Sequence, residues 1–415
     1  MNELNLYADP AAMFPLFPEG EGKQELAKLA LELLEEDAKL QFSRPFAITS
    51  AVSKVVENMN TYYTNKIEGY DTHPLDIEKA LNGNFSNKPE KKNLQLLAKA
   101  HLETAKKVLG IYNNKNDIYS FELLKKIHLS FYELLPEAFK FIETDSGNKI
   151  DVIPGKFRAT EVGVQHHVGP KSDKIGDFAE RFENEYSKNY KSKLDEIIKI
   201  AAAHHRFLFI HPFIDGNGRV ARLFSDICFL NTIHSKFLNV FRLWSVSRGL
   251  ARNRQEYYDR LHNADQKRIN DYDGRGNLSN KYLIEFCEFF LKTAIDQIKF
   301  MQELLDINNL RQGMRSFCDL MVVRKHYPKE AFYLLDETLT KGYLEKKEMA
   351  RLTGKSENTA RKIVKQLVAE GFLIDSNKLA FEISFPAKYL PYLFPSLYPG
   401  NVEAEILREN ERHTI

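Results

Sequence analysis

Residues 210–224 read IHPFIDGNGRVARLF. His211 follows the apolar end of one predicted helix, and a second helix is expected to begin near Asn217. Gly216 and Gly218 allow backbone N–H groups to approach an anion closely, and the second helix adds the positive end of its dipole. This stretch therefore predicts a loop that binds an anion at a helix N-terminus.

The same stretch carries charged groups of both signs. Arg219 and Arg222 are three residues apart, so they lie on one face of the predicted helix beside its N-terminus. Asp215 supplies a carboxylate for a hard cation, and His211 supplies a general base. These groups suit a polyphosphate with Mg²⁺ and a hydroxyl nucleophile. The alternative is a Gly-Asn turn that caps a helix beside solvated arginines; it is less favoured because such a turn requires neither the histidine nor both arginines.

Residues 211–222, HPFIDGNGRVAR, match every position of the signature HPFx[DE]GNGRxxR. The chain therefore resembles Fic domains, enzymes that transfer the AMP moiety of ATP to protein hydroxyl groups, over about residues 50–310. The resemblance implies that His211 is the catalytic base, that Asp215 binds Mg²⁺ or Mn²⁺, and that Arg222 holds the γ-phosphate. The other ATP-binding positions that it implies are Gly216, Asn217, Gly218 and Arg219 in an anion hole, followed by Val220 and Ala221. Phe213 would have a structural role.

A glycine-punctuated segment with alternating apolar residues, PGKFRATEVGVQHHVGP (154–170), predicts a β-hairpin. It resembles the Fic flap, on which a target protein docks by strand addition, and we call it the flap. The resemblance makes four of its residues neighbours of ATP: Val164, Gln165, His166 and His167. The alternatives are a plain surface hairpin or a His-His metal pair; adjacent strand residues point to opposite faces, which makes joint ligation awkward.

Residues 64–69, TNKIEG, match the [ST]xxxE[GN] inhibitory motif of autoinhibited Fic proteins. The resemblance implies that Glu68 also lies in the ATP site, where it pairs bidentately with Arg222 and competes with the γ-phosphate. Thr64 lies one helical turn earlier and is expected to buttress the glutamate. The alternative is a solvated glutamate at a helix end.

Apolar periodicity predicts a mainly α fold: a Fic-type helical core with a β-hairpin flap, then a small winged helix-turn-helix domain. Residues 1–22, rich in Pro and Gly, are expected to form an extended arm. The predicted domains are 1–92 (arm and inhibitory helices), 93–311 (catalytic core) and 312–415 (winged helix). Helices are expected at 23–41, 49–67, 93–110, 120–134, 174–188, 192–208, 217–233, 250–263, 282–311, 317–335, 345–354 and 356–373, before a two-stranded wing at 373–385.

The C-terminal module is more basic than the whole chain. Residues 341–378 contain nine Lys or Arg and five Asp or Glu, a net charge of +4 against +2 overall. Arg361, Lys362 and Lys365 cluster on the helix that would enter a DNA groove. DNA binding and a protein-docking role both remain open for this module.

Composition narrows the class of protein. The 415 residues carry 59 Lys+Arg, 57 Asp+Glu and 3 Cys, which argues against a wholly basic nucleic-acid coat and against a disulfide framework. No apolar run of 18 residues and no secretory signal is visible, so we expect a cytoplasmic protein without a membrane span. Self-modification remains open, as does a homodimer in which the arm at 10–18 covers a neighbouring subunit.

The leading hypothesis is an adenylyltransferase for Ser, Thr or Tyr hydroxyls, inhibited by Glu68. Two alternatives remain. One is a Fic-type transferase of UMP, phosphocholine or phosphate, or an enzyme that removes AMP. The other is a DNA-binding regulator whose core senses ATP.

Overall fold

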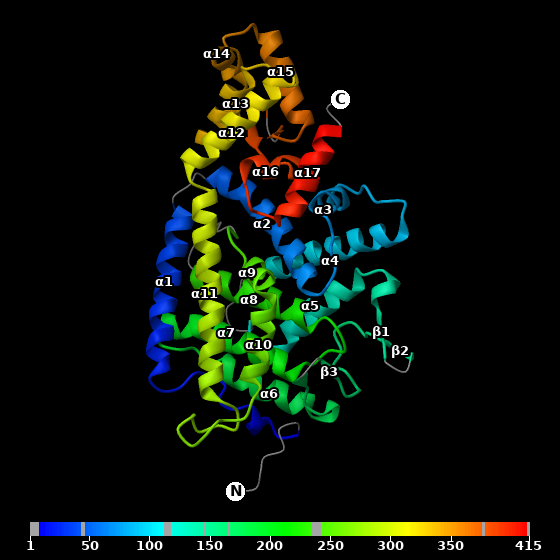
Figure 1. The fold of residues 1–415 in the computed structure, drawn as a ribbon, viewed down its shortest axis with the longest axis vertical. Helices are drawn as coiled ribbons and strands as arrows, with labels where there is room; N and C mark the ends of the chain where they lie inside the picture. Colours follow the sequence, from blue (N-terminus) through cyan, green and yellow to red (C-terminus); the bar gives the residue numbers. More distant parts are fainter. Residues whose placement is uncertain are drawn as a thin grey trace.

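A computed structural model describes residues 8–42, 46–111, 118–144, 147–164, 167–234, 242–375 and 378–412. Within these ranges the chain is mainly α-helical, and its strands form three small antiparallel sheets (Figure 1). The predicted mainly α fold is confirmed. Among the described helices, none combines the length and the apolar character needed to cross a membrane.

The N-terminal arm packs against its own chain. The prediction of a fully extended arm is wrong for Pro10–Met13, which form a 3-10 turn (η1). Asp9 caps this turn, because its side chain accepts a hydrogen bond from Ala11 N. Met13 and Leu16 are buried in the main core, and the Leu16 carbonyl accepts a hydrogen bond from the hydroxyl of Tyr186. These apolar residues are therefore covered within the subunit, and the homodimer stays a prediction.

The described N-terminal part of the chain contains five α-helices. They are α1 (Gly22–Phe42), α2 (Phe46–Ile67), α3 (Pro74–Leu81), α4 (Pro89–Ile111) and α5 (Phe121–Glu133). Helix α3 was not predicted, because its eight residues are too few to show a clear period. Helix α2 packs against α3, α4 and α8 (Asn217–His234), and this packing brings its C-terminal end to the predicted anion site.

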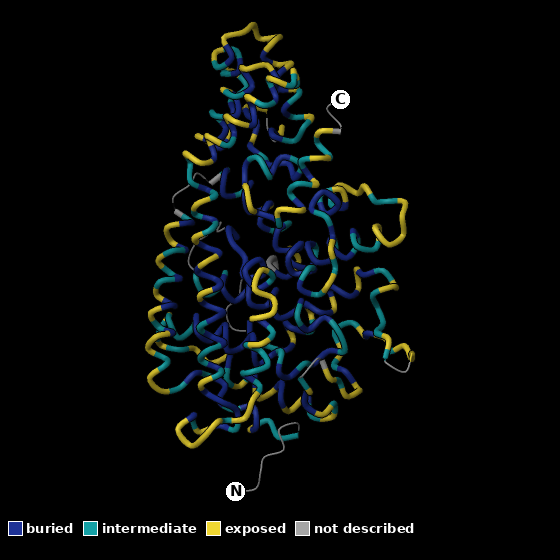
Figure 2. The backbone as a smooth tube through the Cα atoms, viewed as in Figure 1, coloured by how far each residue is buried: buried dark blue, intermediate teal, exposed yellow. Residues whose placement is uncertain are grey.

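The central helices contribute much of the buried core, drawn dark blue in the middle of Figure 2. They comprise α6 (Ile175–Tyr186), α7 (Lys193–Ile210), α8, α9 (Val246–Arg252), α10 (Arg254–Ala264) and α11 (Asn280–Leu304). The long helix α11 runs beside α1 and also contacts α7, α9 and α10 (Figure 1). The prediction of one helix over 282–311 is wrong because Asp306 caps a new helix, α12 (Ile307–Val323), by accepting from the backbone of Asn308 and Asn309 at 2.9 and 3.2 Å.

Two hairpins flank the central helices. Strands β1 (Phe141–Glu143) and β2 (Lys149–Asp151) pair antiparallel, and this hairpin was not predicted. Strands β3 (Gly163–Val164) and β4 (His167–Val168) pair within the flap, with Gly163 opposite Val168 and Val164 opposite His167. The predicted flap hairpin is therefore confirmed.

The C-terminal elements lie together in the upper part of Figure 1. They are α12, α13 (Ala331–Lys341), β5 (Tyr343–Glu345), α14 (Met349–Thr353), α15 (Glu357–Ala369), β6 (Leu373–Ile374), β7 (Ala380–Ile383), α16 (Leu390–Leu393) and α17 (Gly400–Arg412). The predicted helix 317–335 is wrong, because α12 and α13 are separate helices. The sheet order is β5-β7-β6. The winged helix stays a prediction, and the predicted boundary at 311/312 falls inside α12.

Candidate active site

The candidate base, His211, ends helix α7. Ser192 caps the start of this helix by accepting from Leu194 N at 3.2 Å, and His211 closes it with a left-handed backbone (φ 47°), its N–H bonded to the Phe207 carbonyl at 3.1 Å. That conformation costs about 1–2 kcal/mol for a residue with a side chain. The carbonyl of His211 accepts from Arg158 Nε at 2.8 Å, which holds the strained turn in place.

Burial governs the protonation of the His211 ring. Desolvation, together with the nearby charges of His167 and Arg158, lowers the pKa of His211 to about 3. A neutral imidazole is therefore present near pH 7. Because its ring lines a cavity beside the loop, His211 can accept a proton from a bound hydroxyl.

The loop after His211 is fixed by side-chain contacts. Gly216 has φ +83°, and a Cβ there would lie 2.7 Å from the Tyr132 ring, so this position requires glycine. The side chain of Asn217 accepts from Phe213 N at 3.0 Å and donates to Phe213 O at 2.8 Å. Phe213 is buried and stacks on His128 with 4.0 Å between ring centroids, as the structural role predicted for it requires. Asn217 therefore acts in the loop through its side chain.

The candidate metal ligand, Asp215, stays partly open to solvent. Its side chain is 40% exposed, Oδ2 accepts from the Tyr132 hydroxyl at 2.7 Å, and Arg219 Nη1 lies 3.9 Å from the same oxygen. The Asp215 carbonyl lies 3.1 Å from His128 Nε2, and His128 Nδ1 accepts from Gly155 N at 2.8 Å, so Nε2 is the donor. Tyr132 thus holds the carboxylate of Asp215, and His128 holds the backbone of the loop at the same residue.

The donor set around Asp215 suits Mg²⁺ bound together with phosphate. Across the residues that the structure describes, no cluster of three or more His, Cys, Asp or Glu is arranged as a metal cage. Mg²⁺ is commonly held by one or two carboxylates plus substrate phosphates and water. A single accessible carboxylate beside the N-terminus of α8 fits that pattern.

Arg222 is held by two residues of the inhibitory motif. Its Nη2 donates to Glu68 Oε1 at 2.5 Å and to the Thr64 carbonyl at 3.2 Å, while Nε donates to Thr64 Oγ1 at 2.6 Å. Two details of the prediction are therefore wrong. The bidentate pair does not form, because Thr64 takes the Nε edge of the guanidinium; and Thr64 contacts the arginine rather than buttressing the glutamate.

The carboxylate of Glu68 lies against the first turn of α8. A Cβ built on Gly218 would be 2.5 Å from Glu68 Oε1 and 3.0 Å from Arg222 Nη1. Glu68 thus occupies the place beside the helix N-terminus where a phosphate oxygen is expected. The absence of a side chain at Gly218 makes room for this anion.

Three predicted ATP contacts of α8 are not among the residues that line the cavity. Arg219 is 3% exposed, and its guanidinium lies 5.2 Å and 5.4 Å from the ring centroids of Tyr70 and Phe131. Val220 and Ala221 are buried in the main core. The side chains of Val220 and Ala221 therefore stabilise α8.

The flap is attached to the loop by Arg158, a residue that the sequence did not single out. Its guanidinium joins the flap ends to the turn at His211, donating to the carbonyls of His211 (2.8 Å), Thr160 (2.8 Å) and Pro170 (2.5 Å). Of the four predicted ATP neighbours, His167 lines the cavity. The backbone of Val164 pairs in the hairpin, whereas Gln165 and His166 lie outside the described residues.

The cavity has a volume of about 250 Å³. Its walls include Glu68, His167, His211, Gly218 and Arg222 together with residues of α7 and α10: His205, Leu208, Phe209, Gln255, Tyr257, Tyr258, Asp259, Leu261, His262 and Asp265. Buried Tyr257 is fixed by His204 Nε2, 2.7 Å from its hydroxyl. The α10 residues were not predicted as part of the site, because only folding brings them to the loop.

Comparison with known proteins identifies a family whose profile matches part of the chain. The sequence profile of the Fic/DOC family matches residues 119–228. Two proteins named protein adenylyltransferase Fic, from Drosophila willistoni and Drosophila virilis, are 42% and 39% identical over 69 residues, which is 17% of this chain and 14% of each of those proteins. The chain thus spans about one seventh of the length of these relatives.

Solved structures of Fic proteins are also similar to this chain. A Fic family protein from Desulfovibrio desulfuricans G20 has a TM-score of 0.48 at 15% identity, covering 89% of this chain and 98% of that one. Fic-1 from C. elegans has a TM-score of 0.46 at 20% identity, covering 68% and 72%.

Proposed function

Because residues 119–228 form a Fic/DOC domain, we propose that the chain is a transferase that moves AMP from ATP to a Ser, Thr or Tyr hydroxyl of a target protein. The convergence of His211, Gly218 and Arg222 on one cavity supports this proposal. A neutral base, a helix N-terminus and a guanidinium then face the same space. The target docks on the flap beside His211, and self-modification follows the same chemistry.

The reaction is a displacement at the α-phosphorus of ATP. His211 takes the proton of the hydroxyl as its oxygen forms a bond to this phosphorus, and the bond to the β-phosphate breaks to release pyrophosphate. The N-terminus of α8 and Arg222 stabilise the phosphate charges. Mg²⁺ or Mn²⁺, held by Asp215, neutralises phosphate charge when bound.

Autoinhibition is part of the proposal. Glu68 pairs with Arg222 and lies over Gly218, so its carboxylate competes with ATP phosphates for one guanidinium and one helix N-terminus. Two anions at this site repel each other. Release of Glu68 is therefore required for productive ATP binding.

The test is incubation with ATP labelled in the α-phosphate, in the presence of Mg²⁺. Wild type is expected to show weak transfer of label to protein, Glu68→Gly more, and Glu68→Gly/His211→Ala none. Mass spectrometry then identifies the adduct, because UMP, phosphocholine or phosphate each gives a different mass. Label transfer that persists without His211 contradicts the proposal, and loss of AMP from a premodified protein supports the AMP-removing alternative.

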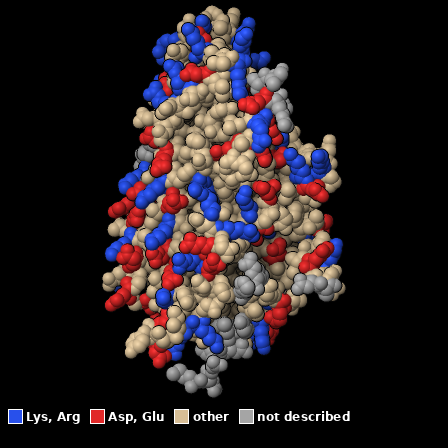
Figure 3. Space-filling view, in the orientation of Figure 1, with Lys and Arg blue, Asp and Glu red and all other residues tan. Residues whose placement is uncertain are grey.

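DNA binding is a second candidate function, favoured by the exposed basic face of α15. Arg361, Lys362 and Lys365 are exposed there, and Lys and Arg gather at this end of the molecule (Figure 3). A helix that reads a DNA groove needs exposed basic side chains. A gel shift with random DNA at low salt tests it: retardation that falls with salt supports a regulator, and none at low salt contradicts it.

A further inference from the structure

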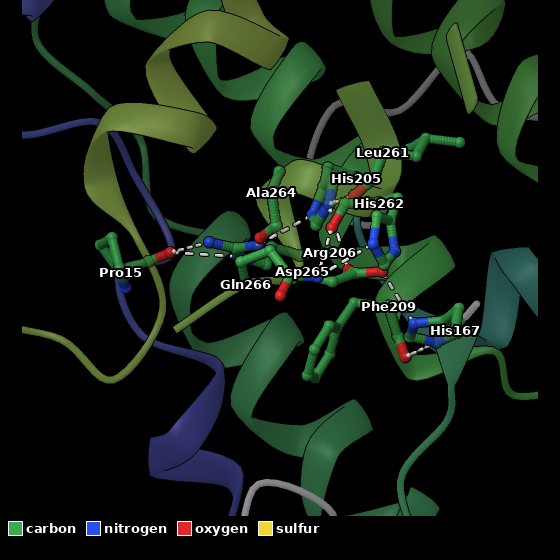
Figure 4. Close-up of polar contacts among 10 residues, drawn as sticks. All are labelled: Pro15, His167, His205, Arg206, Phe209, Leu261, His262, Ala264, Asp265 and Gln266. Carbon is green, nitrogen blue, oxygen red and sulfur yellow. Dashed lines mark hydrogen bonds and ion pairs between the residues drawn. The ribbon is translucent and has the colours of Figure 1, made fainter. Parts of the chain in front are cut away.

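The flap is anchored to the cavity wall through His167. Nδ1 of this residue lies 2.8 Å from Asp265 Oδ2, and Nε2 lies 2.9 Å from the Phe209 carbonyl (Figure 4). Both partners are hydrogen-bond acceptors. A ring that donates to both carries a proton on each nitrogen, so His167 is an imidazolium in this arrangement.

Asp265, the C-cap residue of α10, is itself held in place. Its Oδ1 lies 3.3 Å from His205 Nε2, and His205 Nδ1 accepts from Arg206 Nη1 at 2.8 Å. Arg206 in turn donates from Nε and Nη2 to the carbonyl of Pro15 at 3.1 and 2.8 Å (Figure 4). The chain of contacts thus runs from the flap through α10 and α7 to the buried arm, so the carboxylate has little freedom to move.

The anchor sets how closely the flap approaches the candidate base. The ring centroid of His167 is 6.1 Å from that of His211. Two residues further along the flap, a Cβ on Gly169 would lie 3.5 Å from His211 Cβ and 2.8 Å from Arg158 Nη2. A loss of the anchor therefore changes the distance between a flap-bound segment and the ring of His211.

We propose that Asp265 is a positioning residue: through His167 it anchors strand β4 beside His211, so that a protein segment paired with the flap presents its hydroxyl to the base. The catalytic part of this inference rests on the proposed function. The contact between His167 and Asp265 does not rest on the proposed function, and it is measured separately.

Charge makes the anchor sensitive to pH. The charged or titratable groups that face His167 are Asp265 from α10, His205 from α7, His211 from the catalytic turn and Arg158 from the flap base. Burial disfavours the charged ring, but Asp265 outweighs it and raises the pKa of His167 above 6.5. The anchor is therefore fully present below about pH 6.5 and is lost as pH rises through the raised pKa.

Amide hydrogen exchange of the flap tests the anchor. In Asp265→Asn, the protection of peptides covering β3 and β4 is expected to fall about tenfold at pH 6, because a charge-assisted hydrogen bond is lost. His167→Gln is expected to do the same without altering α10. The matched control is Glu256→Gln, which removes a carboxylate from the same helix that pairs with Arg260 at 3.4 Å. It is expected to leave flap protection unchanged.

Two further readouts separate positioning from a general structural role. In wild type, flap protection is expected to decline as pH rises through the pKa of His167, and this titration disappears in Asp265→Asn. Label transfer from ATP in a Glu68→Gly background is expected to lose kcat about tenfold in Asp265→Asn, with the KM for ATP within twofold. Flap protection that is equal in wild type and in both variants overturns the anchor. Reduced protection in a chain that transfers no label keeps the anchor and overturns the proposed function.

Discussion

Replacing Glu68 by glycine is expected to raise the affinity of the chain for ATP, because it frees Arg222 without breaking helix α2. The residue follows Ile67, the last residue of α2, so glycine at position 68 does not interrupt the helix. Thr64 keeps its contacts with Arg222 Nε and Nη2 at 2.6 and 3.2 Å, and the guanidinium remains aimed at the cavity. The perturbation therefore removes a competing anion and little else.

The size of the effect follows from the geometry of the pair. The side chains of Arg222 and Glu68 are 2% and 22% exposed, and Nη2 and Oε1 are 2.5 Å apart. A hydrogen bond between charged groups in such surroundings contributes about 1.5–3 kcal/mol, and each 1.4 kcal/mol is a factor of ten in an equilibrium constant. The dissociation constant of ATP is therefore expected to fall about ten- to hundredfold.

The assay is titration calorimetry of ATP with Mg²⁺, performed in a His211→Ala background so that no turnover occurs. Glu68→Gln is the matched control: it keeps the shape of the side chain, loses its charge, and is expected to give an intermediate affinity. Combining Glu68→Gly with Arg222→Ala is expected to cancel the gain, because the freed group is absent. A dissociation constant within twofold of the parent in Glu68→Gly refutes the reasoning.

Three other perturbations follow from the same contacts. Since the pKa of His211 is lowered to about 3, its ring stays neutral from about pH 7 down to about pH 5, and kcat/KM for label transfer is expected to show no loss from this group near pH 6.5; a drop centred there contradicts it. Gly216→Ala is expected to destabilise the chain by about 1–3 kcal/mol in chemical denaturation and to reduce transfer, because φ is +83° and the new Cβ meets Tyr132. Tyr398→Ala removes a ring packed edge-on against Tyr62 of α2 (5.2 Å) and is expected to increase label transfer several-fold by loosening α2; unchanged transfer argues against that coupling.

The local part of the site could be predicted from the sequence, and the long-range part could not. Residues 211–222 form a helix end, a tight loop and a helix start, and each of these follows from its own few residues. Arg158 and Asp265 were missed because their roles arise only from contacts with His211 and His167, which are 53 and 98 positions away in sequence. No periodicity or motif encodes such pairs.

The motif at residues 64–69 could be predicted from the sequence only in part. Spacing places Thr64 and Glu68 on one side of the chain, and that much is local. Which of them meets the Nε edge of Arg222 depends on how α2 crosses α8, and this crossing is set by tertiary packing. The sequence therefore indicated that this motif meets Arg222, but it predicted the wrong hydrogen bonds.

The position of α2 depends on the C-terminal end of the chain as well as on the core. Shortly before Glu68 in the chain, the Tyr63 hydroxyl donates to the Leu397 carbonyl at 2.9 Å, and Arg248 of α9 donates to the Ser396 carbonyl at 2.8 Å. The segment 396–398 thus bridges α2 and α9, two helices that pack on each other. A ligand at the C-terminal end shifts the contact between Glu68 and Arg222 only under one condition. It must bind with different affinity when segment 396–398 holds α2 and when that segment has released it. Because the bridge contacts α2 within five residues of Glu68, a C-terminal partner has a direct physical route to the candidate active site.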